Sequence, residues 1–412
     1  MISSLNEILE MKRKPSLGEF DKVSEIIQKV REEGDKALIE FTEKFDGVKP
    51  QYIECPQEEV DKAYEQVDDE LIDALELARE NLENFHSISS VDKDIKLDFE
   101  HTVLGKKYVP VDSAGIYVPG GRASYPSTAL MAGIPARIAG VENIAACTPP
   151  DKDGKIKPLT LVACDIAGID QIYAVGGAQA IAALAYGTET VKRVDKIVGP
   201  GNIYVTMAKL LVQNDVPIDM PAGPSEVLII ADEKADPEFV ALDAAAQLEH
   251  DPMSVAVIIA TSQKAADKIM EETRKIIPET ENLKVAVADI DQAIETSNQF
   301  APEHLELMFE KAEEYFDKVK HAGSVFIGEY SPVAAGDYAT GTNHILPTSG
   351  YARMYSGLSV ETFLKHVTYQ KLTKDALMRL GSAIRILAEA EGLHMHAKSI
   401  EKRIEGEKHD QS

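Results

Sequence analysis

The sequence predicts an α/β protein with two doubly wound, incomplete Rossmann-like domains on parallel sheets, flanked by small helical N- and C-terminal segments. Three observations predict this fold. Between about residues 105 and 330, short β-rich apolar runs alternate with alanine-rich helical runs, a rhythm typical of a parallel sheet covered on both faces. Before and after this region, apolar residues recur at helical spacing. The 412 residues exceed one ordinary core, so at least two domains are expected.

The N-terminal hundred residues are predicted to be mostly helical. Amphipathic runs cover 23–45 and about 60–85, and Gly34-Asp35 interrupts the first of them. The expected strands of the first sheet are 114–118, 144–146, 171–175 and 194–198. The expected helices between and after them are 127–139, 178–185 and 204–211.

The same rhythm continues into a second sheet. Its expected strands are 227–231, 255–260, 285–288 and 324–327, and its expected helices are 237–250 and 263–276. The last 55 or so residues are expected to be helical again, with apolar residues at helical spacing over 376–392. The charged tail from 400 to 412 is expected to fray.

Composition and charge exclude several classes of function. The 43 lysines and arginines against 69 aspartates and glutamates give a formal charge of −26, which argues against nucleic acid and against a polybasic membrane contact. No stretch approaches the apolar length of a membrane span, and no secretion signal is expected at the N-terminus. Three cysteines cannot form a disulfide framework, so we expect a reducing compartment, the cytoplasm.

Glycine is concentrated where predicted strands end. Glycine-rich stretches lie at 115–121, 176–180 and 199–202. A glycine loop that opens a helix turns backbone N–H groups toward an anion, so several such loops on one sheet suit a dinucleotide at the carboxyl ends of the strands. None of them matches G-x-G-x-x-G followed by an acidic residue. Taken singly, each loop is more often a structural turn.

Two segments pair a histidine with another polar side chain. Gln247 and His250 share one face near the end of a helical run, where an amide oxygen and an imidazole could grip one cation. Glu303 and His304 follow Pro302, at an expected helix start. A histidine beside a carboxylate suits general base catalysis. Taken singly, both segments are also explained as ordinary helix termini.

Two further segments add possible metal ligands. Asp337 and His344 lie in a polar, glycine-rich loop after an expected strand, and His396 follows Glu391 where the last helical run closes. The pair His394 and His396 is also explained as cations at a helix C-terminus. A site assembled from Gln247, His250, Asp337 and His396 would offer only N and O ligands, which suits zinc.

Taken together, these segments resemble the histidinol dehydrogenase family. The blocks follow one order along nearly the whole chain, and their joint order and spacing is highly specific. They cover 31–38, 44–47, 115–121, 176–180, 198–205, 218–232, 247–251, 301–305, 336–347, 356–360 and 391–398. The resemblance implies the last steps of histidine biosynthesis: NAD-dependent and zinc-dependent oxidation of L-histidinol, through L-histidinal, to L-histidine.

The resemblance also implies roles for individual residues. Glu303 and His304 match the catalytic pair. The implied zinc ligands are Gln247, His250, Asp337 and His396. The positions that match contacts to NAD are Tyr117, Gln179 and Asn202. The positions that match contacts to the substrate are Ser225, His344 and Glu391, in addition to His304 and the four implied zinc ligands. The family forms a homodimer with shared active sites, in which His396 reaches in from the other subunit.

With this resemblance we divide the chain into four parts. Residues 1–15 form an N-terminal helical arm. Residues 16–116 and 225–358 form the first Rossmann-like domain, which carries the metal and catalytic residues. Residues 117–224 form the second, NAD-binding domain, and 359–412 form a C-terminal helical dimerisation segment.

Three other functions remain open at the level of sequence. An enzyme of the same fold could oxidise another alcohol, such as a sulfonated diol, although Glu391 and His344 favour histidinol. A thiol-dependent aldehyde dehydrogenase would use Cys147 or Cys164, but each lies next to or within an apolar run and is better explained as a buried small residue. A metal-binding structural protein would not need glycine loops at strand ends.

Overall fold

The structure is a computed structural model that describes residues 2–11, 17–88, 94–99, 101–120, 125–278 and 280–405. The chain forms two compact units. The first unit comprises Met1–Ser90 and Val111–Phe363, and the second comprises Val91–Pro110 and Leu364–Ser412. None of the described helices is long and apolar enough to cross a membrane.

The first unit begins with helices, as the sequence predicts. They are α1 (Leu5–Leu9), α2 (Leu17–Glu33), α3 (Asp35–Asp46), α4 (Gln57–Tyr64) and α5 (Asp69–Ile88). Gly34, at φ +54°, separates α2 from α3, which confirms the expected break. These helices pack separately, because Ile8 of α1 joins the core of one sheet whereas Val30 of α2 and Leu38 of α3 join that of the other.

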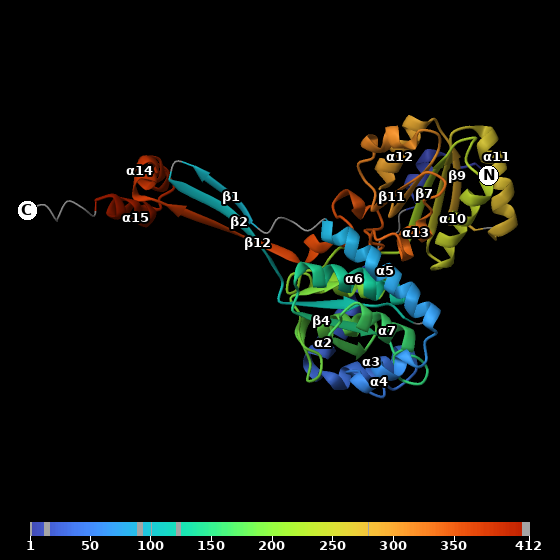
Figure 1. Ribbon diagram of the computed structural model, residues 1–412, viewed down its shortest axis with the longest axis horizontal. Helices are drawn as coiled ribbons and strands as arrows, with labels where there is room; N and C mark the ends of the chain where they lie inside the picture. The colour runs from blue at the N-terminus through green and yellow to red at the C-terminus, as the bar shows by residue number, and fades with distance from the viewer. Residues whose placement is uncertain are drawn as a thin grey trace, which may run out of the picture. The chain divides into compact units, whose positions relative to one another are not determined.

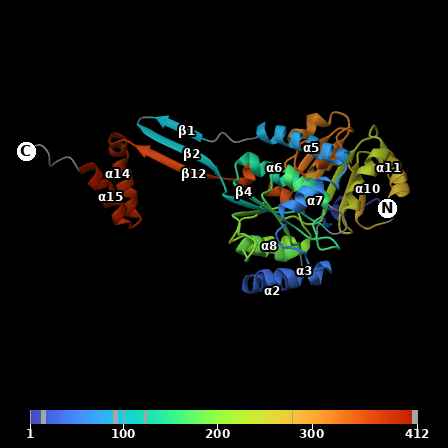
Figure 2. The ribbon, with the colours of Figure 1, turned by 60° about the horizontal axis from the view of Figure 1, so that its bottom comes forward.

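The first parallel sheet has four strands in the order β5-β4-β3-β6. They are β3 (Ser113–Tyr117), β4 (Asn143–Thr148), β5 (Gln171–Ala174) and β6 (Lys196–Val198). Helices α6 (Pro126–Ala139) and α7 (Pro158–Ile166) cover one face, and α8 (Gly177–Tyr186) and α9 (Ile203–Val212) cover the other. In Figure 2, β4 lies between α6 and α8. The chain order reverses between β3 and β6, the point where doubly wound sheets bind ligands.

The second parallel sheet has five strands in the order β11-β10-β7-β8-β9. They are β7 (Glu226–Ala231), β8 (Val255–Ala260), β9 (Leu283–Val287), β10 (His304–Met308) and β11 (Ser324–Ile327). Helices α10 (Pro237–Glu249) and α11 (Gln263–Ile276) cover one face, and α12 (Ile290–Phe300) lies with α1 on the other (Figure 1). Shorter elements complete the unit: η1 (Ala312–Lys318), α13 (Val333–Tyr338), η2 (Tyr351–Arg353) and η3 (Val360–Phe363).

The second unit is an antiparallel sheet followed by two helices. Strands β1 (Asp94–Phe99), β2 (Thr102–Pro110) and β12 (Leu364–Leu372) pair in the order β1-β2-β12, and α14 (Lys374–Ala390) and α15 (His394–Glu405) follow. The expected run of helix over the last 55 residues is therefore wrong at β12. Val367, Thr368 and Tyr369 favour a strand, and the Tyr369 ring lies over Gly105 of the neighbouring strand.

The predicted α/β class with two parallel sheets is confirmed. The division into four parts stays a prediction. Of the tail expected to fray, residues up to Glu405 continue α15, and 406–412 lie outside the described residues, as do 121–124, which include the end of the first glycine stretch.

Candidate active site

Glu303 and His304 lie at the amino-terminal edge of the five-stranded sheet. The expected helix start is wrong here, because His304 is the first residue of β10. Helix α12 ends at Phe300, Ala301 adopts a left-handed conformation at φ +49°, and Pro302 follows. The next segment is buried between β7 and β11. Burial on both sides makes this apolar run a central strand rather than a helix.

The Glu303 carboxylate is buried and held by the backbone. Its Oε2 accepts a hydrogen bond from the N–H of Glu226, at the start of β7, at 2.8 Å. Only 6% of Glu303 is exposed. Burial raises the pKa of Glu303 to about 7, because a carboxylate loses hydration there. The group therefore exchanges a proton near neutral pH, as a general acid or base requires.

His304 is fixed between two carboxylates. Its Nδ1 lies 3.2 Å from the carbonyl oxygen of Glu226, which can only accept, so Nδ1 carries a proton. Nδ1 also lies 3.5 Å from Glu303 Oε2, and Nε2 lies 3.5 Å from Asp337 Oδ1. Burial alone would lower the pKa of His304, but the Glu303 and Asp337 carboxylates raise it to about 9. Nε2 is therefore the atom free to exchange a proton.

Asp337 lies in α13, where the sequence predicts a loop. The helix begins after Pro332, and the N–H of Val333 in its first turn, which has no partner within the helix, donates to Glu306 Oε1 at 2.9 Å. Burial alone would raise the pKa of Asp337, but hydrogen bonding and charge from His304, then the charges of His344 and His250, lower it. Asp337 thus stays ionised, as a metal ligand must.

His344 links this cluster to the helix that covers the other sheet. Its Nδ1–H donates to the Asp337 carbonyl at 2.8 Å, and its Nε2 accepts from the Thr128 hydroxyl of α6 at 3.4 Å. Burial lowers the pKa of His344, so the ring is neutral at pH 7. A neutral, oriented imidazole suits contact with a bound substrate.

Gln247 and His250 come to the same edge at the end of α10. Gln247 is 2% exposed, and neither its Oε1 nor its Nε2 has a hydrogen-bond partner among the described residues. A buried amide without partners is costly. Its oxygen, the His250 imidazole and the ionised Asp337 carboxylate are N and O donors that fit zinc. The described ranges contain no group of three His, Cys, Asp or Glu side chains already arranged around a metal position.

The remaining predicted site residues are dispersed over the chain. Ser225 directly precedes β7, where its carbonyl accepts the N–H of Val255 at 3.0 Å. Glu391 is the exposed C-cap of α14, and His396 is exposed in the first turn of α15. The expectation that both close a helix therefore holds for Glu391 and is wrong for His396. Both residues belong to the second unit.

The predicted contacts to NAD gather at the carboxyl edge of the four-stranded sheet. The hydroxyl of Tyr117, at the end of β3, accepts the N–H of Gly177 at 3.0 Å. Gln179 is 1% exposed, and within the described part of the chain both its amide atoms lack a partner. Asn202 caps α9, where its Oδ1 accepts the N–H groups of Tyr204 and Val205. Glycine loops and an unpartnered buried amide at this edge fit a dinucleotide.

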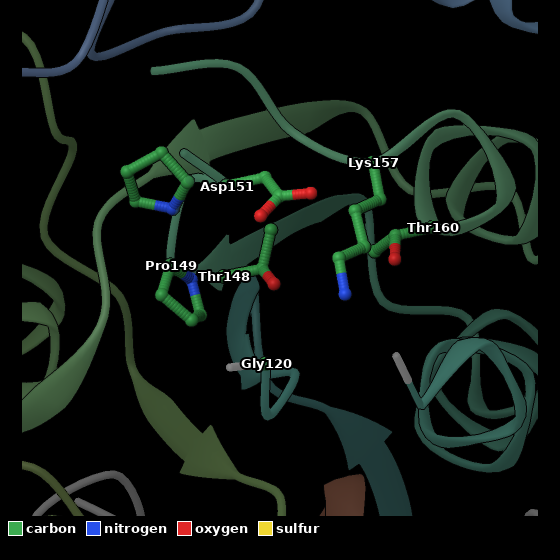
Figure 3. A pocket seen from close by; sticks show the side chains of 7 residues that line it. Gly120, Thr148, Pro149, Asp151, Lys157 and Thr160 are labelled. Carbon is green, nitrogen blue, oxygen red and sulfur yellow. The ribbon is translucent and has the colours of Figure 1, made fainter. Parts of the chain in front are cut away.

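A small pocket opens at the ends of β3 and β4 (Figure 3). Its lining includes Gly120, Thr148, Pro149, Asp151, Lys157 and Thr160. Lys157 is the N-cap of α7. Because the pocket carries one charge of each sign, it provides room beside the glycine loop but does not by itself select an anion.

The two cysteines of the thiol-dependent alternative do not fit a nucleophile. Cys147 and Cys164 are fully buried. Burial raises the pKa of both thiols, that of Cys164 to about 12. A catalytic cysteine needs a lowered pKa and access to solvent, so both are structural.

Sequence reasoning missed two buried ionisable groupings. Glu306 follows His304 by two residues in β10 and is fully buried, and Lys209 forms a buried ion pair with Asp219. A glutamate inside an otherwise apolar strand was the available signal for Glu306. Lys209 gives none, because a lysine in an amphipathic run usually marks a solvated helix face.

Glycine loops at one parallel sheet and a buried acid–base cluster at the other are typical of a nucleotide-dependent oxidoreductase. Comparison with known proteins narrows this class, since the family model described as histidinol dehydrogenase matches residues 12–404. The chain belongs to the histidinol dehydrogenase family, which is NAD-dependent and zinc-dependent and acts in the final steps of histidine biosynthesis. The resemblance found in the sequence is thereby confirmed.

Individual relatives are similar over more than nine-tenths of their length. The chain is 58% identical to the histidinol dehydrogenase of Archaeoglobus fulgidus, over 97% of this chain and 100% of the relative. It is 53% identical to that of Methanocaldococcus jannaschii, over 93% and 92%. Among solved structures, histidinol dehydrogenase from Elizabethkingia anophelis matches with a TM-score of 0.92 and 41% identity, covering 98% of this chain and 97% of that one.

Proposed function

We propose that this chain oxidises L-histidinol to L-histidine in two NAD-dependent steps, with L-histidinal retained between them, and that Glu303, His304 and Asp337 form the centre of the site. The observation that carries the proposal is the buried cluster itself, in which His304 lies 3.5 Å from each carboxylate. Buried titratable groups held against their own desolvation are typical of active sites.

His304 acts as the general base for the alcohol. Its Nδ1–H donates to the Glu226 carbonyl, so Nε2 of the neutral ring takes the alcohol proton. Because the Glu303 and Asp337 carboxylates raise the pKa of His304 to about 9, the ring first loses its Nε2 proton, a loss that a cation held by Asp337 would favour. Glu303, which exchanges a proton near neutral pH, accepts a proton from the water that adds to the aldehyde. Tyr117, Gln179 and Asn202 would hold NAD, which would supply the hydride acceptor for each oxidation.

The donor set supports zinc as the metal. Its ligands are Gln247, His250 and Asp337, with His396 of the partner subunit in a homodimer that shares its active sites. Zinc, when bound, orients the imidazole and amine of histidinol rather than generating hydroxide. Ser225, His344 and Glu391 are the remaining proposed substrate residues, Glu391 by the family resemblance alone. The three cysteines support the cytoplasm as the compartment.

The stoichiometry of the reaction tests this proposal. Zinc-loaded enzyme is expected to form two NADH per histidinol consumed; a chelator should abolish turnover, and added zinc should restore it. Sulfonated and short unsubstituted diols serve as competing substrates. One NADH per substrate, or faster turnover of a diol than of histidinol, would refute the assignment of substrate and reaction.

A further inference from the structure

A buried ion pair lies beneath the glycine loop that follows β6. Lys209 Nζ lies 2.5 Å from Asp219 Oδ1, and the two side chains are 2% and 0% exposed. No other lysine or arginine ion pair among the described residues is buried this deeply. Removing two charges from water is costly, and such a pair contributes little net stability compared with apolar side chains. Its position therefore calls for a role other than stability.

The ion pair binds both backbone groups of a single residue, Gly199. Lys209 Nζ donates to the Gly199 carbonyl oxygen at 2.7 Å, and Asp219 Oδ2 accepts the Gly199 N–H at 2.8 Å. Asp219 Oδ1 also accepts the N–H of Met220 at 2.7 Å. Charge-assisted hydrogen bonds of this kind are the stronger ones in proteins. The two peptide groups that flank the Gly199 Cα are thus each held by one side chain of the ion pair.

Gly199 needs this support because its conformation is unusual. Its φ is +115°, and a Cβ at this position would collide with the backbone oxygen of Tyr117. Glycine reaches this conformation without a steric penalty but is also free to leave it. The ion pair therefore selects one conformation of an otherwise mobile residue and keeps it against the end of β3.

Two residues near Gly199, Tyr117 and Asn202, are among those assigned to NAD. Tyr117 ends β3, and Asn202 closes the loop as the N-cap of α9. Lys209 stands on that same helix, and Asp219 follows it along the chain. We propose that Lys209 and Asp219 are positioning residues for NAD, which hold the 199–202 loop in the form that receives the dinucleotide. This inference rests on the proposed function, because it takes the 199–202 loop as part of the NAD site.

Charge-removing variants of the full-length, zinc-loaded enzyme test the role of the pair. In Asp219→Asn and in Lys209→Met, the Kd for NAD measured by calorimetry is expected to rise at least about tenfold. The KM for histidinol at saturating NAD and the bound zinc should change less than about twofold. Both single variants leave one buried charge without its partner, so their melting temperatures fall.

The double variant Lys209→Met/Asp219→Asn separates positioning from stability. It contains no unpaired buried charge, so its melting temperature should recover toward that of the parent. Its Kd for NAD should stay raised, because the Gly199 carbonyl loses its Lys209 donor and a neutral amide accepts the Gly199 N–H more weakly than a carboxylate does. This variant also keeps the test available should a single variant fail to fold. Recovery of NAD affinity together with the melting temperature would overturn the positioning role.

A packing variant on the same helix is the matched control. Val212, the last residue of α9, is fully buried and lies away from the loop. Val212→Ala should lower the melting temperature without weakening NAD, and an equal loss of NAD affinity would overturn the inference. If the parent enzyme oxidises no histidinol but the variants still change its NAD affinity as expected, the proposed function is refuted. The positioning role of Lys209 and Asp219 is then still supported.

Discussion

The two parallel sheets of the first unit carry their functional residues at opposite ends of their strands and in different chemical form. At the carboxyl edge of the four-stranded sheet, the groups predicted to contact NAD are neutral: backbone of the 199–202 loop, the Tyr117 hydroxyl and the Gln179 amide. At the amino edge of the five-stranded sheet, they are ionisable: Glu303, His304 and, nearby, Asp337.

The two edges therefore carry different free-energy penalties for the folded protein. The neutral edge costs conformational freedom, because Gly199 must keep a φ of +115°. The ionisable edge costs desolvation, which raises the pKa of Glu303, whereas the neighbouring Glu303 and Asp337 carboxylates raise the pKa of His304 against its own desolvation. Binding a dinucleotide needs a loop of fixed conformation with hydrogen-bond donors. Proton transfer instead needs groups that titrate near neutral pH. The comparison predicts that variants at the two edges fail in different ways.

The largest effect is expected at the ionisable edge. His304→Asn removes the Nε2 base but keeps a polar side chain of similar reach, so kcat should fall by about 10²–10⁴-fold. The Kd for NAD should stay within about twofold of the parent's, because His304 lies at the other sheet. Steady-state kinetics and calorimetry measure the two quantities.

The control for this substitution is His101→Asn. His101 is exposed in the turn between β1 and β2 at φ +66°, a conformation that asparagine also tolerates. Its kcat and melting temperature should match those of the parent. A His304→Asn enzyme with kcat near that of the parent would break the comparison, since the chemistry would then not depend on this edge.

A smaller effect, on stability, is expected at the neutral edge. Gly199→Ala forces a Cβ toward the Tyr117 backbone oxygen and should lower the free energy of unfolding by roughly 2–4 kcal/mol. Gly47 ends α3 at φ +73° with nothing within 4 Å of the position of a Cβ. Gly47→Ala should therefore cost only about 1 kcal/mol. Denaturant unfolding compares the two, and equal losses would show that crowding at Tyr117 is unimportant.

The same comparison explains how much the sequence could predict. Residues 255–260 and 263–276 are predicted and observed with the same bounds, because hydrophobic periodicity and turn residues are local signals. The glycine loops are correctly placed at strand ends for the same reason. The residues of the neutral edge can thus largely be predicted from the sequence, because they lie in short contiguous stretches.

The ionisable edge is harder to predict from the sequence, because it depends on contacts between residues that are far apart in the chain. His304 begins a strand only because β7 and β11, far apart in sequence, bury it on both sides. Likewise β12 pairs with β2, more than 250 residues earlier. Taken singly, the segments with Gln247, Glu303 and Asp337 each had an ordinary structural explanation. Only their joint resemblance to one family groups these segments from the sequence.

The smallest effect concerns Glu306, whose buried carboxyl tests the cost of desolvation at a residue outside the proposed catalytic, metal and substrate residues. Burial, then the charge of Asp243 and more weakly that of Asp337, raise the pKa of Glu306 to about 8. The folded protein therefore holds this proton more tightly than the unfolded chain does. The associated stability is fully present below about pH 4.5 and is lost as the pH rises through about 8. Glutamine mimics the protonated form and carries no such pH dependence.

Glu306→Gln should therefore match the parent near pH 5 and exceed its free energy of unfolding by about 1 kcal/mol or more at pH 8.5. Urea unfolding of metal-free protein at the two pH values measures the difference. Glu310→Gln is the control, because Glu310 is exposed and paired with Lys234 at the surface; its difference from the parent should not grow with pH. The prediction fails if, at pH 8.5, Glu306→Gln raises the free energy of unfolding no more than Glu310→Gln does. Burial of the Glu306 carboxylate would then not destabilise the folded protein.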